Sequence, residues 1–393
     1  MRQVGIVGIG HTKFGRMDFD LVDIMSWAAL EAMKDAGITD GIDQVFVANM
    51  GGSAINHQTG IASSLVSRIF LEPAMAELIE NGPASGSSAV KCGYMAIASG
   101  MADVVLVVGG ERMREVTGWK ATDFVATLSH PDAEYAYGLT LPAFAGIFAR
   151  AYVERYGLTE KHLATLAVKA HRNASLNPFA HIEESATLSG IWDGPHRDVV
   201  NPIMADPLRL YDFCPVSDGA AAVVLCGLDV ASRFTKHVPV RIAGIGQATD
   251  THCVHNRADM LDLKAVRMAA ERAYAMAGIG PKEISLAELH DAFLILEVAE
   301  SEEVGFFERG QAKAAIERGE TEVTGRIPIN TSGGLKAKGH PVGATGVSQI
   351  HELVKQLRGQ AEAGRQVAEP KFGLAVNFGG FGNNVVATIL AKE

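Results

Sequence analysis

The sequence predicts an α/β protein built from two copies of one strand–helix–strand unit. Residues 28–38 (AALEAMKDAGI) and residues 269–279 (AAERAYAMAGI) share six of eleven residues. Each segment follows an apolar run that ends in glycine and precedes a second apolar run. Apolar runs that alternate with helical patterns are typical of α/β folds with parallel strand pairing. Because the order of all these elements repeats, we interpret the chain as a duplicated domain, rather than two helices that are both rich in alanine.

The elements of the first copy follow in order. Strand-like runs begin at Val4 (VGIVGIG) and Gln44 (QVFVAN), and the helix between them ends at Gly37, a residue that suits a helix C-terminus. A second helix, rich in small residues, is expected to begin near Pro83 and to lead to a strand at Val104–Val108.

The second copy repeats this order. Its apolar runs begin at Val240 (VRIAGIG) and Ser285 (SLAELH), and its first helix ends at Gly278. A helix beginning near Pro341 then leads to a strand at Gly373–Val376.

Residues 119–200 interrupt the pattern with a segment rich in proline and aromatic residues and with an amphipathic helix. We therefore predict an N-terminal half formed by residues 1–118 with about 201–235, an inserted loop domain at 119–200, and a C-terminal half at 236–393.

Composition excludes several classes of protein. The net charge is −10 and the chain has no run of Lys or Arg, which argues against nucleic-acid binding. The four cysteines form no C-x-x-C pair, so neither a zinc site nor a disulfide framework is indicated, and a reducing cytoplasm is expected. The uncharged stretch at 219–228 is too short for a membrane span, which needs about 20 residues.

Two histidines are candidates for chemistry. His290 follows a predicted strand, and the carboxyl ends of parallel strands are where α/β sheets bind ligands. His340 directly precedes Pro341, and proline suits the first turn of a helix. A single histidine is more often structural, but two at such positions favour a functional site.

Several motifs together resemble the thiolase superfamily, and its archaeal-type and sterol-carrier-protein-type branches in particular. They run through the chain in the family's order: HRNASLNP (171–178), CPVSDGAAAVVL (214–225), HDAF (290–293), GGLKAKGHPVGATG (333–346) and NFGGFG (377–382). The resemblance implies a duplicated, five-layered α/β/α/β/α fold and a coenzyme A thioester as substrate. It also implies a homodimer or homotetramer, with neither a metal nor a covalently bound cofactor.

The resemblance assigns roles to individual positions. In the family, a cysteine at the start of a buried helix attacks the thioester, and His340 matches the histidine that activates it. His290 matches a group of the first oxyanion hole. Gly379 matches the glycine that completes a second oxyanion hole with the backbone N–H of the cysteine.

The nucleophile itself is missing, because the family's cysteine position is occupied by Pro83 in ENGPASGSSA. Proline supplies neither a thiol nor a backbone N–H, so the acyl-enzyme route loses its nucleophile and one oxyanion donor. Cys92 lies nine residues further on, about 900° around the helix and therefore on the opposite face. Ser85 would need a positioned base, and Ala292 and Asn377 leave no thiol where other relatives have one.

The insert supplies a further candidate. In the family, the loop containing Asp132, Glu134, Tyr135 and Tyr137 covers the acyl pocket, so the two tyrosines are possible substrate contacts. Ordinary loop packing explains them equally well. His130 and His171 are expected to be structural or surface residues.

Two hypotheses remain open, both connected with lipid or aromatic degradation. The chain is either an acyl-CoA lyase that performs aldol or retro-aldol chemistry with His290 and His340, or a degenerate thiolase subunit. Such a subunit would work with a cysteine-bearing paralogue or with a zinc-ribbon/OB-fold partner. The survival of both histidine motifs disfavours a plain binding module.

Overall fold

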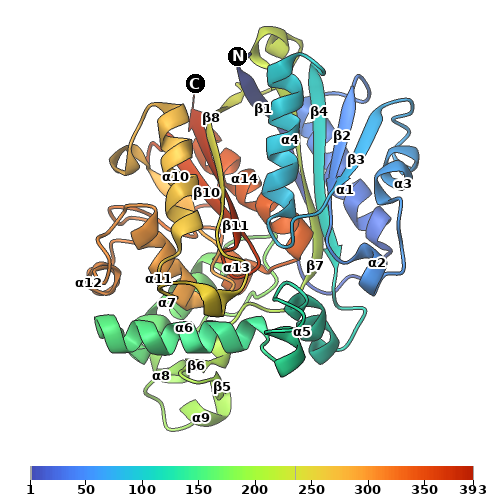
Figure 1. The fold of residues 1–393 in the computed structure, drawn as a ribbon. Helices are drawn as coiled ribbons and strands as arrows, with labels where there is room; N and C mark the ends of the chain where they lie inside the picture. Colours follow the sequence, from blue (N-terminus) through green and yellow to red (C-terminus); the bar gives the residue numbers. More distant parts are fainter. Residues whose placement is uncertain (1, 235, 393) are drawn as a thin grey trace.

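The computed structural model describes residues 2–234 and 236–392, which form two similar halves and an insert (Figure 1). The N-terminal half contains β1 (Val4–His11), α1 (Leu21–Ala36), β2 (Gln44–Ala48), α2 (Gly52–Ile55), α3 (Ile61–Arg68), β3 (Met75–Ile79), α4 (Ser85–Ser99), β4 (Val104–Arg112) and β7 (Asp218–Gly227). The C-terminal half contains β8 (Val240–Thr249), α10 (Lys264–Ala277), β9 (Leu286–Glu288), α11 (Leu294–Glu303), α12 (Ala312–Glu317), α13 (Gly334–Lys338), α14 (Val342–Arg358), β10 (Phe372–Gly379) and β11 (Asn384–Lys392).

The strand order reveals the duplication directly. One half has the strand order β3-β2-β4-β7-β1, and the other continues it as β8-β11-β10-β9. Corresponding strands of the two halves therefore follow each other in reverse order. A bridge between Ala287 and Ile329 takes the place of a fifth strand in the second half. β1 and β8 pair at Gly5–Arg241 and Ile6–Val240, which joins the halves at one edge.

The predicted parallel pairing is only partly right. β2 pairs in parallel with β3 and β4, and β9 pairs in parallel with β10. However, β7 and β11 are antiparallel to their neighbours, so each half is a mixed sheet. β1 runs in the same direction as β2, but the two strands do not pair. β4 and β7 lie between them in the sheet.

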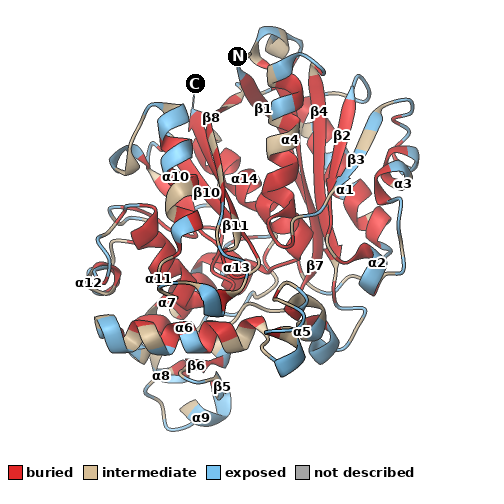
Figure 2. Cartoon of the chain, in the orientation of Figure 1, coloured by how far each residue is buried: buried red, intermediate tan, exposed pale blue. Residues whose placement is uncertain are grey.

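The layers follow from strands that are buried on both faces. Along β4, Val104, Leu106 and Val108 join a core cluster with α1, whereas Val105 and Val107 join a central cluster with α4 and α14. The central cluster also contains Ala375 and Leu390 of the other half. α1 with α3, the first sheet, α4 with α14, the second sheet, and α10 therefore form five layers, and Figure 2 shows the sheets and central helices buried.

The helix ends are where the sequence placed them, within two residues. Gly37 and Gly278 end α1 and α10 in the left-handed conformation, with φ of 78° and 71°. α4 begins at Ser85, just after Pro83, and α14 begins at Val342, just after Pro341.

The two central helices touch through glycine near their N-terminal ends. A Cβ added to Gly86 would lie 2.8 Å from the backbone nitrogen of Gly346, and one added to Gly346 would lie 2.2 Å from that of Ser87. Since real Cβ contacts are never this short, only glycine permits the approach. This contact sets how closely the starts of α4 and α14 come together.

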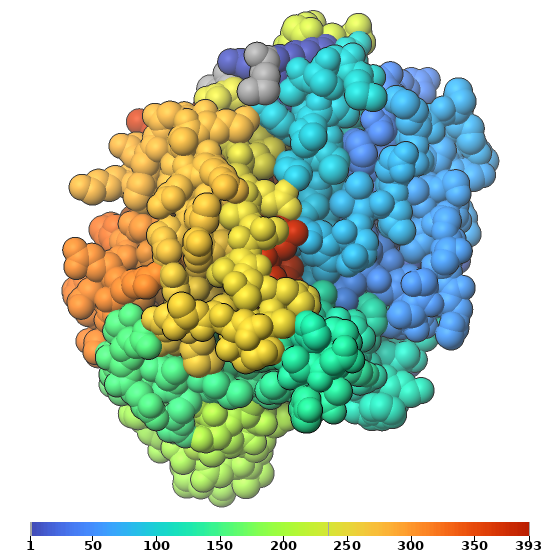
Figure 3. All heavy atoms as spheres, viewed as in Figure 1, coloured from blue at the N-terminus to red at the C-terminus, as the bar shows by residue number. Residues whose placement is uncertain are grey.

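The insert lies between β4 and β7, across the ends of both halves (Figure 3). It contains α5 (Gly118–Ala126), a 3₁₀ turn at Tyr135–Tyr137, α6 (Leu141–Tyr156), α7 (Glu160–Ser175), α8 (Leu188–Ile191), α9 (Arg197–Val200), β5 (Ile203–Ala205) and β6 (Leu208–Arg209). The predicted insert at 119–200 lies within this segment. Among residues 2–234 and 236–392, no helix has the length and apolar character needed to cross a membrane.

Candidate active site

A single cavity brings together the residues that the sequence singled out. It measures about 440 Å³, and Pro83, His290 and His340 all line it. Most of the remaining lining is apolar, and it comes from the insert as well as from the two halves. These apolar residues include Ala121, Val125, Leu141, Met204, Phe213, Phe293 and Phe381.

His340 bonds α14 through one ring nitrogen, Nδ1, and leaves the other, Nε2, for the cavity. Its Nδ1 lies 2.6 Å from Oγ1 of Thr345, and that hydroxyl donates to the carbonyl of Pro341 at 3.0 Å. We assign the hydroxyl proton to the bond with Pro341, so that Nδ1 donates to Oγ1 of Thr345 and Nε2 carries the lone pair. Burial lowers the pKa of His340 to about 3, so the ring is a neutral base at physiological pH.

His290 stands edge-on to His340, with the ring centroids 4.9 Å apart and the ring planes at 87°. Its other face stacks on Phe378, at 5.3 Å and 2°. Burial, and then the neighbouring His340, lower the pKa of His290 well below its usual value. Both imidazoles are therefore neutral, and each is held in a fixed orientation.

Pro83 occupies the turn that leads into α4. Gly82, at φ +54°, and the hydrogen bond from Ala84 N to Asn81 O shape this turn. Ser85 is fully buried, and its hydroxyl accepts from Asn81 N at 2.8 Å and donates to Gly82 O at 2.5 Å. The hydroxyl of Ser85 is thus used within the turn and is not available as a nucleophile.

Gly379 lies against the same turn, at the end of β10. A Cβ at this position would be 2.9 Å from the carbonyl oxygen of Asn81, and the next residue, Gly380, lines the cavity. The NFGGFG motif (377–382) is therefore adjacent to the turn that contains Pro83, as the resemblance implies. Its role as an oxyanion donor stays a prediction.

One thiol among the described residues, that of Cys214, lines the cavity without having been a candidate from the sequence. Cys214 lies beside Ala292, since its backbone N–H donates to the Ala292 carbonyl at 3.0 Å. Burial raises the pKa of the Cys214 thiol to about 12, so it is protonated and a poor nucleophile. Cys214 is the first residue of CPVSDG, one of the motifs that carry the resemblance, but nothing in this motif indicates that Cys214 lines the cavity.

The tyrosines of the insert loop lie elsewhere. Neither Tyr135 nor Tyr137 is among the residues that line the cavity, and Tyr137 is 79% exposed. Tyr135 donates its hydroxyl to Asp123 at 2.8 Å. Glu134 instead fastens the loop, because its buried carboxylate accepts from His130 N and from Val254 N.

His130 and His171, which the sequence predicts to be structural or surface residues, have structural contacts. His130 Nδ1 accepts from the backbone nitrogens of Asp132 and Ala133, which closes a turn. His171 bonds the Glu184 carbonyl at 2.9 Å, and burial lowers its pKa to about 4.

A buried carboxyl connects the two halves beneath the cavity. Glu111, at the end of β4, accepts from Asn49 Nδ2 at 2.7 Å and from the backbone nitrogens of Met50 and Gly51. It also accepts from Gly343 N, in the first turn of α14, at 3.1 Å. Burial raises the pKa of Glu111 to about 7. This residue therefore holds the helix that follows His340 against the N-terminal sheet.

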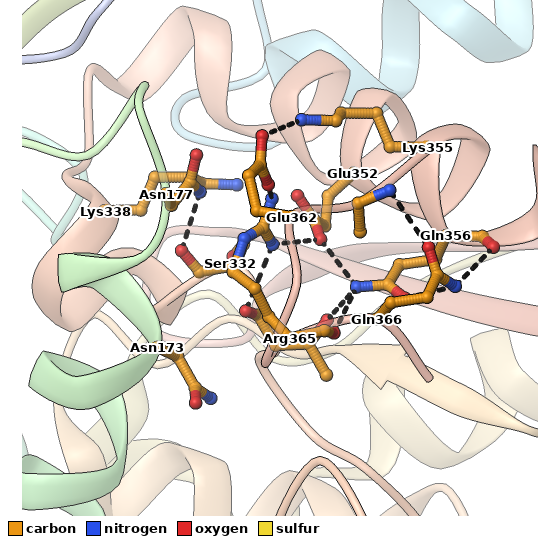
Figure 4. Close-up of polar contacts among 12 residues, drawn as sticks. Asn173, Asn177, Ser332, Lys338, Glu352, Lys355, Gln356, Glu362, Arg365 and Gln366 are labelled. Atoms are coloured by element: carbon orange, nitrogen blue, oxygen red, sulfur yellow. Dashed lines mark hydrogen bonds and ion pairs between the residues drawn. The ribbon is translucent and has the colours of Figure 1, made fainter. Parts of the chain in front are cut away.

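The loop that leads to His340 is fixed by a second buried network (Figure 4). The Ser332 carbonyl accepts from Asn177 at 2.8 Å, and the Thr331 carbonyl accepts from Arg365 at 3.2 Å. Arg365 is fully buried and pairs with Glu352 at 2.6 Å. The loop before α13 thus has little freedom to move.

Within the described ranges, no three His, Cys, Asp or Glu side chains are grouped as metal ligands would be. The chemistry that the visible residues support is proton transfer by imidazole next to an apolar binding space.

Comparison with known proteins places these features in a family. The model of the thiolase N-terminal domain matches residues 4–229, and the model described as thiolase C-terminal domain-like matches residues 246–392. An acetyl-CoA acetyltransferase of Methanothermobacter thermautotrophicus is 38% identical over the full length of both chains. The benzoylsuccinyl-CoA thiolase subunit BbsB of Thauera aromatica is 30% identical, over 91% of this chain and 90% of that protein.

Among solved structures, the Ltp2-ChsH2(DUF35) aldolase superimposes with a TM-score of 0.83 at 25% identity. The match covers 99% of this chain and 98% of that one. The duplicated five-layered fold, the paired histidines and the two family models lead to one conclusion: the chain belongs to the thiolase family of acyl-CoA acyltransferases.

Proposed function

We propose that this protein forms or breaks a carbon–carbon bond of an acyl-CoA by aldol or retro-aldol chemistry, without an acyl-enzyme. The observation that carries the proposal is Pro83, which lines the cavity beside His290 and His340 where a nucleophile would be needed. The one thiol among the described residues that line the cavity, that of Cys214, is protonated because burial raises its pKa to about 12. Proton transfer is what the remaining groups can perform.

The retro-aldol direction can be written with these residues alone. His340 Nε2 removes the proton of the β-hydroxyl, the Cα–Cβ bond breaks, and a carbonyl forms at Cβ. The electron pair moves into the thioester, where the enolate oxygen is stabilised by a donor from His290. The imidazolium of His340 then returns its proton to Cα, which gives a shortened acyl-CoA and an aldehyde or ketone.

The cavity supports an apolar acyl group larger than acetyl. Since one water molecule takes up about 30 Å³ in the liquid, the cavity of about 440 Å³ has room for roughly fifteen water-sized groups. Phe213, Phe293 and Phe381 suit a branched or ring-containing chain. The similarity to an aldolase supports the same reaction class.

The test is incubation with 3-hydroxyacyl-CoAs that carry apolar branched or ring substituents at Cβ. We expect acetyl-CoA to appear together with an equal amount of trapped ketone or aldehyde. His196→Ala, on the exposed surface of the insert, is the matched control for His340→Ala. Thiolysis of acetoacetyl-CoA by the parent protein would contradict the proposal.

A second candidate function is that of a subunit in a larger thiolase-type complex. The name of BbsB describes a subunit, and the aldolase structure pairs a thiolase-like chain with a DUF35 protein. We propose that a partner of this kind, a zinc-ribbon/OB-fold protein or a cysteine-bearing paralogue, completes the enzyme. Co-purification with such a chain, and inactivity of this chain alone, would favour this candidate.

We also propose a homodimer or homotetramer. In support, the edge strand β3 exposes Met75 and Leu78, and α4 exposes Met95, at 46%, 43% and 56%. Exposed apolar side chains on an edge strand are typical of an interface. A cytoplasmic location stays a prediction, which the free state of the four cysteines supports.

A further inference from the structure

Asn377 is a fully buried amide that touches His290, and neither the acid–base pair nor the cavity lining includes it. Its Nδ2 lies 3.2 Å from His290 Nδ1, and its Oδ1 lies 3.4 Å from the backbone nitrogen of Ser87. It stands where other thiolases have a cysteine, so its function cannot be that of the thiol.

The orientation of the amide is determined by the backbone. The N–H of Ser87 can only donate, so the atom of Asn377 that faces it must be the carbonyl oxygen. The amide nitrogen is then directed at His290. Because Ser87 lies in the first turn of α4, next to Gly346, the backbone contact of the two central helices holds the amide in place.

We propose that Asn377 is a positioning residue that keeps His290 in the tautomer with the proton on Nε2. The amide N–H donates to Nδ1, so Nδ1 must carry a lone pair and Nε2 must carry the proton. A second donor favours the same tautomer, because the backbone nitrogen of Phe378 lies 3.4 Å from Nδ1 of His290 and donates to it.

The consequence is a division of labour between two neutral rings. His340 carries its lone pair on Nε2, since Thr345 uses its Nδ1, whereas His290 carries the Nε2 proton. The cavity therefore holds one base and one hydrogen-bond donor. This inference rests on the proposed function only for its catalytic meaning, because the tautomer is a property of the free protein.

The titratable groups around His290 do not set its tautomer. Glu300 accepts the backbone N–H of His290 at 2.9 Å, and Asp291 accepts that of Leu335, so neither carboxyl bonds the ring in this structure. Burial raises the pKa of both carboxyls. His340 faces the ring edge-on and is neutral.

The test compares the parent protein with Asn377→Asp by nitrogen NMR of ¹⁵N-histidine-labelled protein, with His290→Asn used to assign the signals. In the parent we expect His290 to show a protonated Nε2 and an unprotonated Nδ1 throughout pH 6–10. In Asn377→Asp the new carboxylate accepts rather than donates, so Nδ1 should become protonated as the pH rises. Asn201→Asp is the matched control, because its Oδ1 also accepts a backbone N–H and its Nδ2 faces a carbonyl.

Kinetics then test the catalytic meaning. With a substrate that the parent cleaves, Asn377→Asp should lose about 10²-fold in kcat at the pH where Nδ1 is protonated, with KM changed less than threefold. A protonated Nδ1 in the parent, or a pattern in Asn377→Asp that does not change with pH, would overturn the inference. The expected NMR result without any retro-aldol turnover would leave the inference standing and contradict only the proposed function.

Discussion

The two halves of the molecule have the same architecture but different residues at corresponding positions. After β2 the first half has Asn49, and after β9 the second half has His290. Before α4 the first half has Pro83, and before α14 the second half has His340. Asn49 is occupied with Glu111, and Pro83 has no proton to give. Both halves line the cavity, and under the proposed function the second half would supply the acid–base groups while the first would supply a wall.

The largest effect should come from the second half. His340→Ala removes the base, and we expect a loss of about 10³–10⁴ in kcat for cleavage of a 3-hydroxyacyl-CoA. Steady-state kinetics measure this loss, and His196→Ala should stay within twofold of the parent. Equal activity of His340→Ala and the parent would mean that the base lies in the other half.

His290→Ala should have the next largest effect, about 10²–10³ in kcat, because it removes one donor to the enolate oxygen. KM should change much less, since the ring contributes to the transition state more than to binding. A variant with unchanged kcat and a raised KM would place His290 in binding rather than catalysis.

Changing the first half should add an activity rather than remove one. Pro83→Cys restores both a thiol and a backbone N–H, so we expect thiolysis of acetoacetyl-CoA to rise at least tenfold above the parent. A spectrophotometric assay of thioester loss measures it, and mass spectrometry detects the acylated cysteine. Pro83→Ala is the control, since it restores only the N–H. Thiolysis by the parent at the rate of Pro83→Cys would remove the difference between the halves.

The dependence of stability on acid pH should not distinguish the two halves, although loss of activity on mutation should. Burial lowers the pKa of both His11, at the end of β1, and His340 to about 3. The unfolded chain binds these protons near pH 6.5, so stability is present above pH 6.5 and falls as the pH drops toward 3, by about 1.4 kcal/mol per unit for each ring.

Urea unfolding between pH 4 and pH 8 measures this slope. His11→Gln and His340→Gln should each flatten it to a similar degree, whereas only His340→Gln should lose activity. His11 has both ring nitrogens bonded, to Thr12 O and Ser348 Oγ, so its role is structural. An unchanged slope in both variants would contradict the buried neutral state of these rings.

The smallest effect is expected in the insert. Tyr137→Ala should change KM and kcat by less than twofold, because the side chain is 79% exposed and does not line the cavity. Tyr135→Phe is its companion and loses only the bond to Asp123. A tenfold rise in KM for either variant would restore the substrate-loop hypothesis.

The sequence was sufficient for the features that depend on local signals. Glycines after the repeated helices marked their ends, and prolines at 83 and 341 lay one or two positions before α4 and α14. The convergence of His290 and His340 followed from motifs at strand and helix ends. The family models and the fold confirm the resemblance that these motifs carried.

Other features depend on how distant segments pack, and no local pattern announces them. Cys214 reaches the cavity because its strand-like segment lies beside Ala292, 78 residues away in the sequence. β7 lies between β4 and β1, and β11 lies between β8 and β10. Each runs antiparallel to both of its neighbours, which come from earlier in the chain. Asn377 contacts His290 because β10 pairs in parallel with β9, and the two residues each lie two positions beyond the partners Ala375 and Glu288.

The glycine contact between α4 and α14 has a consequence for how such a protein changes over evolutionary time. Gly86 and Gly346 meet through backbone, so the spacing between the turn at Pro83 and the turn at His340 does not depend on which side chain occupies position 83. A substitution there alters the chemistry without disturbing the frame. The backbone contact thus sets the spacing of the two turns, whereas the residue at position 83 sets which group faces the cavity.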